Sequence, residues 1–140
     1  MMPVSGARTQ LLPGLYDETP DGPRLCASRC ELCGRHAFPA RGACPRCKRR
    51  SMRPAQIGAR AQLYSFTVCH AAPAGWRASY LQAYFRLPEG ITVFGLVSDT
   101  VVPSADALRP GQLMELVVEP VWPGSGQVTC KYRPLEDDDA

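Results

Sequence analysis

Residues 30–47, CELCGRHAFPARGACPRC, contain two Cys-x-x-Cys pairs separated by ten residues. Each pair lets two thiolates point at one centre, so two pairs complete a tetrahedral shell of four sulfur atoms. Zinc suits such a shell because its filled d shell imposes no geometry and thiolates are soft donors. The stretch therefore predicts a closed, structural metal site held by Cys30, Cys33, Cys44 and Cys47.

Other roles for these thiols are disfavoured or left open by the same pattern. A secreted disulfide scaffold is disfavoured because the chain has seven cysteines, an odd number, and the paired spacing is typical of metal sites in a reducing compartment. A thioredoxin-like redox pair would need a helix after the motif, and none is visible in the sequence. Iron in a rubredoxin-type site has the same sulfur geometry, so zinc and iron both stay open.

The whole chain has the size and composition of one small globular protein. It has 140 residues, 45% of them hydrophobic, without an apolar run long enough to span a membrane or an apolar signal segment. We therefore expect a cytoplasmic protein with no membrane association. The composition divides it into an N-terminal arm (1–23), a zinc ribbon (24–55), a barrel (56–134) and a disordered acidic tail (135–140).

The second half of the chain has the pattern of an all-β domain. Short β-rich runs separated by turns occupy residues 61–70, 80–87, 91–98, 113–122 and 127–134. Between the third and fourth runs lies room for one turn of helix. This order is that of an OB-fold, so the predicted architecture is an N-terminal rubredoxin-like zinc ribbon followed by a five-stranded OB-fold barrel. In the first run, Tyr64, Phe66 and Val68 alternate and are expected to face the core.

Residues able to carry out catalysis alone are not found together in the sequence. The histidines are His36 and His70 only, and the acidic residues are scattered at turns and strand ends. Cys69 and His70 are adjacent, but neighbours on a strand point to opposite faces and do not converge on one substrate. We therefore expect no catalytic residue in this chain.

Several phrases together resemble a known family. The segments RCELCGRHAFPARGACPRC, GARAQLYSFTVCHAAPAGW and LRPGQLMELVVEPV resemble, in the same order, the thiolase-associated zinc-ribbon/OB-fold proteins, formerly a domain of unknown function. The resemblance covers roughly residues 14–134. It implies a non-catalytic accessory subunit of a thiolase, hydroxymethylglutaryl-CoA synthase, acyltransferase or steroid aldolase, in a hetero-oligomer of two-plus-two subunits or larger.

The same resemblance implies what each subunit contributes. The large, thiolase-fold subunit carries the catalytic residues that make or break C–C bonds in acyl-CoA thioesters. The small subunit helps to form the coenzyme A and acyl channel and stabilises the complex. Trp76 lies in a Pro/Gly-rich loop, where a large aromatic has no periodic reason to be buried. With the resemblance, we expect His70, Trp76, Arg77 and Tyr80 to contact coenzyme A or the partner.

The charge pattern leaves alternatives open. Residues 24–60 carry ten Lys or Arg against one acid, a net charge of +9, or near +7 once four thiolates are bound to Zn²⁺. Such a field attracts the phosphates of coenzyme A, but it would equally attract nucleic acid, and it can serve solubility alone. The main alternative is therefore a single-stranded nucleic-acid-binding ribbon/OB protein, and a third is a free-standing acyl-CoA carrier or sensor.

Overall fold

The computed structural model describes residues 9–70, 80–99, 102, 104–122 and 124–135. These residues form strands and a single short 3-10 helix: β1 (Thr9–Gln10), β2 (Tyr16–Thr19), β3 (Gly22–Cys30), β4 (His36–Ala37), β5 (Met52–Ile57), β6 (Arg60–Cys69), β7 (Tyr80–Arg86), β8 (Thr92–Leu96), η1 (Ala105–Ala107), β9 (Leu113–Pro120) and β10 (Gln127–Pro134). Within these ranges there is no helix of the length and apolar character that crossing a membrane requires.

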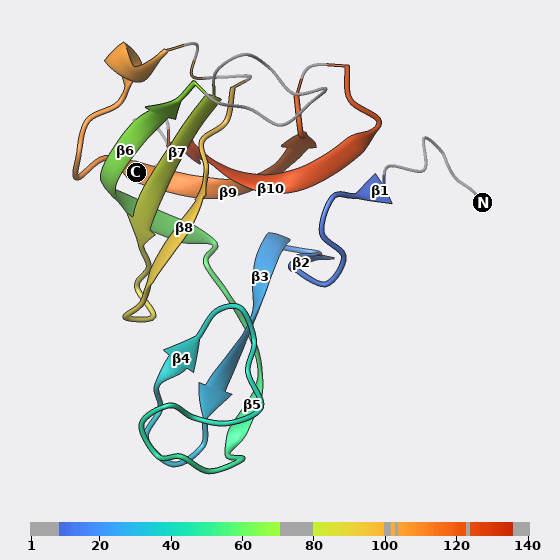
Figure 1. The fold of residues 1–140 in the computed structure, drawn as a ribbon, viewed down its shortest axis with the longest axis vertical. Helices are drawn as coiled ribbons and strands as arrows, with labels where there is room; N and C mark the ends of the chain where they lie inside the picture. The colour runs from blue at the N-terminus through green and yellow to red at the C-terminus, as the bar shows by residue number, and fades with distance from the viewer. Residues whose placement is uncertain (1–8, 71–79, 100–101, 103, 123, 136–140) are drawn as a thin grey trace.

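Strands β6 to β10 form a curled sheet that closes into a barrel (Figure 1). The order in the sheet is β10-β9-β6-β7-β8, all neighbours being antiparallel. A parallel bridge between Val97, just after β8, and Tyr132 of β10 joins the two ends of this order. This is the connectivity of an OB-fold, with η1 between the third and fourth strands, and it confirms the predicted fold class.

The barrel strands lie where the alternation of the sequence places them. Each of the five begins and ends within two residues of its predicted run. Two details of that prediction are wrong: Tyr64 and Val68 do not face the core but are 52% and 37% exposed, while Leu63 is buried. The register of β6 against β7 shifts between Leu63 and Ser65, and such a bulge inserts an extra residue that turns the following side chains to the other face.

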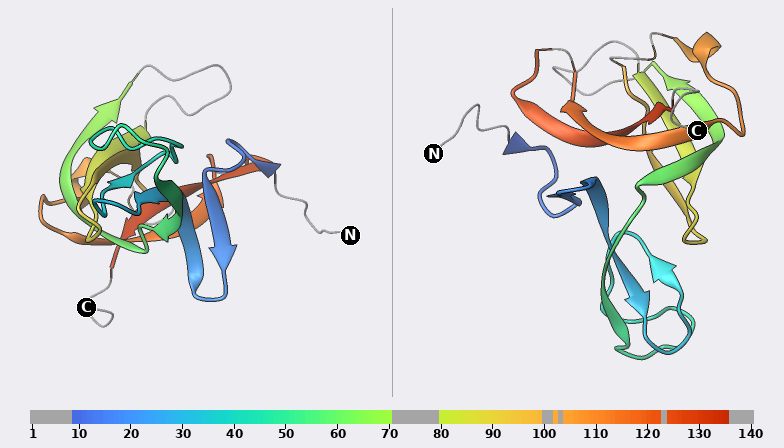
Figure 2. Two further views of the ribbon diagram at one scale, coloured as in Figure 1. Left: turned by 90° about the horizontal axis from the view of Figure 1, so that it is seen from below. Right: turned by 180° about the vertical axis from the view of Figure 1, so that it is seen from behind.

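The ribbon is a second, smaller sheet built around β3 (Figure 2). The last part of β3 pairs with β4 on one side and with β5 on the other, whereas its first part pairs with β2. Residues 16–19, expected in an N-terminal arm, thus form β2, and residues 9–10 form β1, which pairs in parallel with β10 of the barrel. Residues 136–140 of the expected tail lie outside the described residues.

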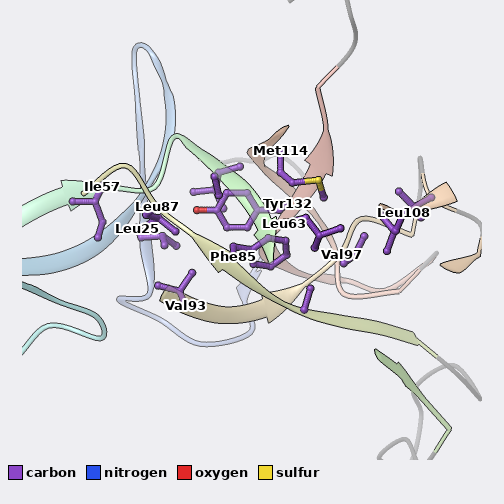
Figure 3. Packing of buried hydrophobic residues seen from close by; sticks show 14 of the residues in the cluster. Leu25, Ile57, Leu63, Phe85, Leu87, Val93, Val97, Leu108, Met114 and Tyr132 are labelled. Carbon is purple, nitrogen blue, oxygen red and sulfur yellow. The ribbon is translucent and has the colours of Figure 1, made fainter. Parts of the chain in front are cut away.

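The ribbon and the barrel share one hydrophobic core. Leu25 of β3 and Ile57 of β5 belong to the same buried cluster as Leu87 and Val93 at the end of the β7–β8 hairpin (Figure 3). The junction between β5 and β6 is Gly58, whose φ of +82° favours glycine. A Cβ added there would lie 2.7 Å from the Tyr132 hydroxyl and 2.8 Å from Leu25 Cδ1, so the two parts meet too closely for a side chain.

Candidate functional site

The two Cys-x-x-Cys pairs form two turns of the same shape. In the first turn the N–H of Gly34 donates to the Cys30 carbonyl at 2.9 Å, and in the second the N–H of Lys48 donates to the Cys44 carbonyl at 2.8 Å. Gly34 and Lys48 both have a positive φ, 78° and 57°. The left-handed residue after each pair closes the turn, so both cysteines of a pair point to the same side.

These turns bring the four predicted ligands together. The Sγ atoms of Cys30, Cys33, Cys44 and Cys47 all lie within 4.8 Å of one another. The Cys30–Cys47 and Cys33–Cys44 sulfur distances are 3.8 and 3.7 Å. A tetrahedron with metal–sulfur bonds of ~2.3 Å has edges of about 3.8 Å, whereas a disulfide bond is about 2 Å long. All seven cysteines of the chain, each within the described residues, are free, so the cluster has the dimensions of a metal site.

The sulfur cluster is partly enclosed and surrounded by hydrogen-bond donors. The side chains of Cys30 and Cys44 are buried together with Met52. The N–H groups of Leu32 and Cys33 lie 3.4 Å from Cys30 Sγ, and the N–H of Cys47 lies 3.4 Å from Cys44 Sγ. These N–H groups stabilise negative charge on sulfur, as thiolate ligands require.

The thiols of the cluster do not all ionise alike. The hydrogen bond with Ser51, whose Oγ lies 3.1 Å from Cys30 Sγ, lowers the pKa of Cys30 to about 6. The N–H of Cys47 lowers the pKa of Cys44, while hydrogen bonding to Cys33 raises the pKa of Cys47 to about 12. Four adjacent thiolates repel one another and ionise together only around a cation. The donor set therefore fits a bound metal ion.

The residues expected to contact coenzyme A or a partner are only partly described. His70 is exposed and directly follows β6, and the half-buried Tyr80 begins β7 opposite Cys69. The structure thus places His70 and Tyr80 at the same end of the β6–β7 pair. Trp76 and Arg77 lie outside the described residues. The Cys69 thiol donates to Gln82 Oε1 at 2.8 Å.

Exposed aromatic side chains lie across the outer face of β6, β7 and β8. Tyr84 and Phe94 are 48% and 49% exposed, and their ring centroids are 4.9 Å apart. The Arg86 guanidinium lies 4.1 Å above the centre of the Tyr64 ring. Aromatic and Arg side chains on a surface are typical of contact sites for proteins or stacked rings.

A groove of about 520 Å³ begins beside this face; we call it the β8 groove. All of β8 lines it, together with part of β10. Leu11, Leu12 and Leu15 of the segment that follows β1 and Phe38 of the ribbon also line it. None of the described residues that line the β8 groove is charged. A groove of this volume and apolar character is typical of binding sites.

The basic residues of the ribbon face solvent. Arg53 pairs with Glu31 at 3.1 Å, the one acid of the segment, and both side chains are more than half exposed. Other exposed cations of the ribbon are Arg29, Arg35, Arg41, Arg46, Lys48, Arg49 and Arg50. Their exposure leaves the ribbon surface strongly positive.

Some residues of these sites carry no clear sequence signal. Ser51 is a single polar residue outside the cysteine motif, and its contact with Cys30 depends on how β5 pairs with β3. The β8 groove forms from segments far apart in the sequence, and only the run Leu11–Leu12 with Leu15 hinted that the N-terminal segment packs on another surface.

Comparison with known protein families finds a match for most of the barrel. The family model described as "ChsH2, C-terminal OB-fold domain" matches residues 55–119. A solved structure described as an Ltp2–ChsH2(DUF35) aldolase has a TM-score of 0.64 to this chain at 24% identity, covering 79% of this chain and 84% of that one. At this identity the likeness shows a shared fold.

Comparison of whole sequences extends the likeness to the ribbon. A DUF35 domain-containing scaffold protein of Methanocaldococcus jannaschii is 32% identical over 120 residues, which are 81% of this chain and 83% of that protein. The benzoylsuccinyl-CoA thiolase subunit BbsA of Thauera aromatica is 33% identical over 84 residues, 59% of this chain and 58% of that protein.

Proposed function

Because this chain belongs to the DUF35 family of ribbon and OB-fold proteins, we propose that it is a non-catalytic accessory subunit of a thiolase-like enzyme that acts on acyl-CoA thioesters. The observation that carries the proposal is its similarity to a thiolase subunit and to a scaffold protein. The partner is a thiolase-fold subunit, in a complex of two-plus-two subunits or larger. The partner supplies the nucleophile and the oxyanion hole that C–C bond cleavage or formation requires.

Within this complex the ribbon (24–55) has a structural role. We assign Cys30, Cys33, Cys44 and Cys47 as ligands of one Zn²⁺ ion, supported by sulfur distances of 3.7 and 3.8 Å. When bound, zinc neutralises the thiolates and holds the two turns together; with four protein ligands it leaves no open position for substrate. The ion contributes to folding of a unit whose own apolar cluster is small.

The barrel (56–134) contributes to the coenzyme A and acyl channel in this proposal. His70 and Tyr80 lie at one end of β6 and β7, and residues 71–79, which include Trp76 and Arg77, separate them in the sequence. The exposed cations of the ribbon favour the phosphates of coenzyme A over neutral ligands. Trp76→Ala is expected to weaken either complex formation or coenzyme A affinity. A variant with both unchanged would remove the channel role proposed for Trp76.

The proposal is tested by co-purification. A thiolase-fold protein from the same genome is co-expressed with this chain, and only this chain carries a tag. Elution of both proteins together in gel filtration, with near one zinc ion per small chain, is the expected result. Elution of this chain alone would contradict the proposal.

A second function is favoured by one observation, the exposed rings of Tyr64, Tyr84 and Phe94 on the outer face of the barrel. OB-folds bind single strands on such stacking platforms next to basic surfaces. This function predicts binding of single-stranded DNA whose affinity falls steeply with salt concentration, and loss of that binding in Tyr84→Ala. The accessory-subunit proposal predicts neither.

A further inference from the structure

Strand β8 (Thr92–Leu96) is an edge of the barrel sheet, because the barrel closes only beyond it, at the bridge from Val97 to Tyr132. It is the last strand of its sheet and pairs with β7 on one side. The N–H of Val97 donates to the carbonyl of Leu81 in β7, whereas the N–H of Ser98 donates across to the carbonyl of Tyr132 in β10. Since backbone groups alternate along a strand, those of Thr92 and Phe94 point away from β7. Within the described residues no backbone bond joins Thr92 or Phe94 to a strand on that side.

This edge lacks the features with which proteins protect open strands. Native edges carry charges or proline, or are very short, because a long bare edge pairs with other chains. Among the other described edge strands, β2 contains Asp17 and Glu18, and β5 contains Arg53 and Pro54. Strands β1 and β4 have two residues each. The sequence of β8, TVFGL, has five residues and neither charge nor proline. Strand β8 therefore has the features of an edge that pairs with another polypeptide segment.

The β8 groove runs along this edge and is neutral throughout. All five residues of β8 line it, and the leucines that follow β1 line it as well. Leu12 and Phe94 are 57% and 49% exposed, so apolar surface on both sides is available. A second groove, of about 720 Å³ beside β3 and β5, is lined by Asp17 and Arg41 among others. The contrast indicates that the β8 groove selects an uncharged occupant.

The chemistry of the groove narrows the occupant further. A hydrocarbon chain would bury the edge N–H and C=O groups without hydrogen-bond partners, which is costly. A charged segment would lose its hydration without gaining a counter-charge. A second copy of this chain would have to bring its whole sheet edge against β8, where the leucines after β1 and Phe38 of the ribbon stand opposite. A single extended polypeptide segment meets none of these obstacles.

We propose that β8 pairs with one extended, uncharged segment of the large thiolase-type subunit, which enters the β8 groove as an added strand. This inference rests on the proposed function, since it names where the partner docks. Main-chain hydrogen bonds to Thr92 and Phe94 hold the segment, and its alternate side chains pack against Leu12, Leu15 and Phe94. Such strand addition is a common mode of peptide recognition.

The test compares two variants at one exposed position of the edge. By the alternation along β8, the N–H of Thr92 points away from β7 and toward the groove. Thr92→Pro removes this N–H, whereas Thr92→Ala keeps it. Thr92→Pro is expected to bind the purified large subunit at least about tenfold more weakly than Thr92→Ala, by calorimetry. Leu113→Ala, which removes an exposed apolar side chain from β9 away from the groove, serves as the control with wild-type affinity. Equal affinities for the two Thr92 variants would overturn the proposal.

Hydrogen exchange on the wild-type chain provides a measurement that does not depend on folding of the proline variant. The amides of Thr92 and Phe94 are expected to exchange at least about tenfold more slowly in the complex than in the free chain. If a complex forms and these amides stay unprotected, the proposed function holds and this docking mode is wrong. If no complex forms, both are wrong. If the free chain self-associates and Thr92→Pro abolishes this, a second copy occupies the edge instead.

Discussion

Gly34 and Lys48 are structural equivalents, although they are residues of very different types. Each follows a Cys-x-x-Cys pair, each donates its N–H to the carbonyl of the first cysteine, and each has a left-handed backbone with φ of 78° and 57°. Glycine adopts this conformation freely, whereas lysine does so at a cost. The need to aim two thiols at one centre therefore outweighs the local preference of Lys48.

This equivalence predicts opposite responses to exchanging the residue types. Gly34→Ala is expected to destabilise the zinc-loaded protein by about 1–2 kcal/mol, because alanine is strained in this conformation. Its Cβ would also lie 3.4 Å from Arg29 Nη2. Lys48→Gly is expected to change stability by less than about 1 kcal/mol, since relief of strain offsets the greater freedom of glycine in the unfolded chain. Chemical denaturation of both variants measures this. A larger loss in Lys48→Gly would contradict the assigned roles.

The metal assignment predicts a loss specific to the cluster. Cys44→Ser is expected to reduce the bound zinc from near one ion per chain to well below one and to expose the ribbon to proteolysis, since a buried ligand is lost. Cys69→Ser is the matched control, because Cys69 bonds to Gln82 outside the cluster. Elemental analysis after purification at equal zinc supply gives the comparison. Full zinc content in Cys44→Ser would exclude the four-cysteine site.

Two cations on β10 differ sharply in burial and provide a test of electrostatics. Lys131 is 2% exposed, with its Nζ 2.9 Å from Asp99 and 3.1 Å from the Val121 carbonyl. Lys131→Met is expected to destabilise the protein by about 3–5 kcal/mol, because it removes a buried cation from its carboxylate partner.

The matched variant on the same strand is Arg133→Met. Arg133 is exposed and donates to Glu115 at 2.7 Å. An exposed pair contributes little, so this change is expected to cost less than about 1 kcal/mol. Urea denaturation gives both values. Similar costs for the two variants would mean that burial of Lys131 has no energetic consequence.

The Tyr132 hydroxyl predicts a dependence of stability on alkaline pH. It donates to the Gly58 carbonyl at 2.7 Å, and burial raises the pKa of Tyr132 above its ordinary value of 10.0. Above pH 10 the unfolded chain loses this proton while the folded chain keeps it, so stability is full below pH 10 and falls as the pH rises further.

Tyr132→Phe is expected to flatten this alkaline dependence and to cost about 1 kcal/mol at neutral pH, because the Gly58 carbonyl loses its donor. Tyr84→Phe, at a ring 48% exposed, is the control with an unchanged slope. Thermal unfolding of both variants and the wild type between pH 8 and 11 measures these slopes. An unchanged slope in Tyr132→Phe would assign the alkaline loss of stability to other groups.

The sequence suffices for those parts of the fold in which each element follows local rules. The barrel strands β6 to β10 follow from apolar alternation and turn residues, and the cysteine cluster follows from spacing alone. Tyr64 was misplaced because a bulge after Leu63 changes the register, and no local pattern marks it. Pairing of β1 with β10 is likewise a long-range choice that two residues cannot signal.

In the candidate sites, too, local patterns predict some residues, whereas contacts between distant segments determine the others. The four cysteines were predictable, whereas the contact of Ser51 with Cys30 arises from pairing between β3 and β5. The β8 groove combines the N-terminal segment, the ribbon and the barrel, so its neutral lining becomes visible only when these segments are brought together. Trp76 and Arg77 stay predictions, since both lie outside the described residues.

We propose that this chain supports catalysis by a partner without performing it. The most direct measurement is acyl-CoA turnover by a fixed amount of the thiolase-fold subunit as this chain is added. We predict that turnover rises and saturates at a fixed ratio of the two chains, and that this chain alone has none. Turnover by the large subunit that is independent of this chain, or turnover by this chain alone, would contradict the account.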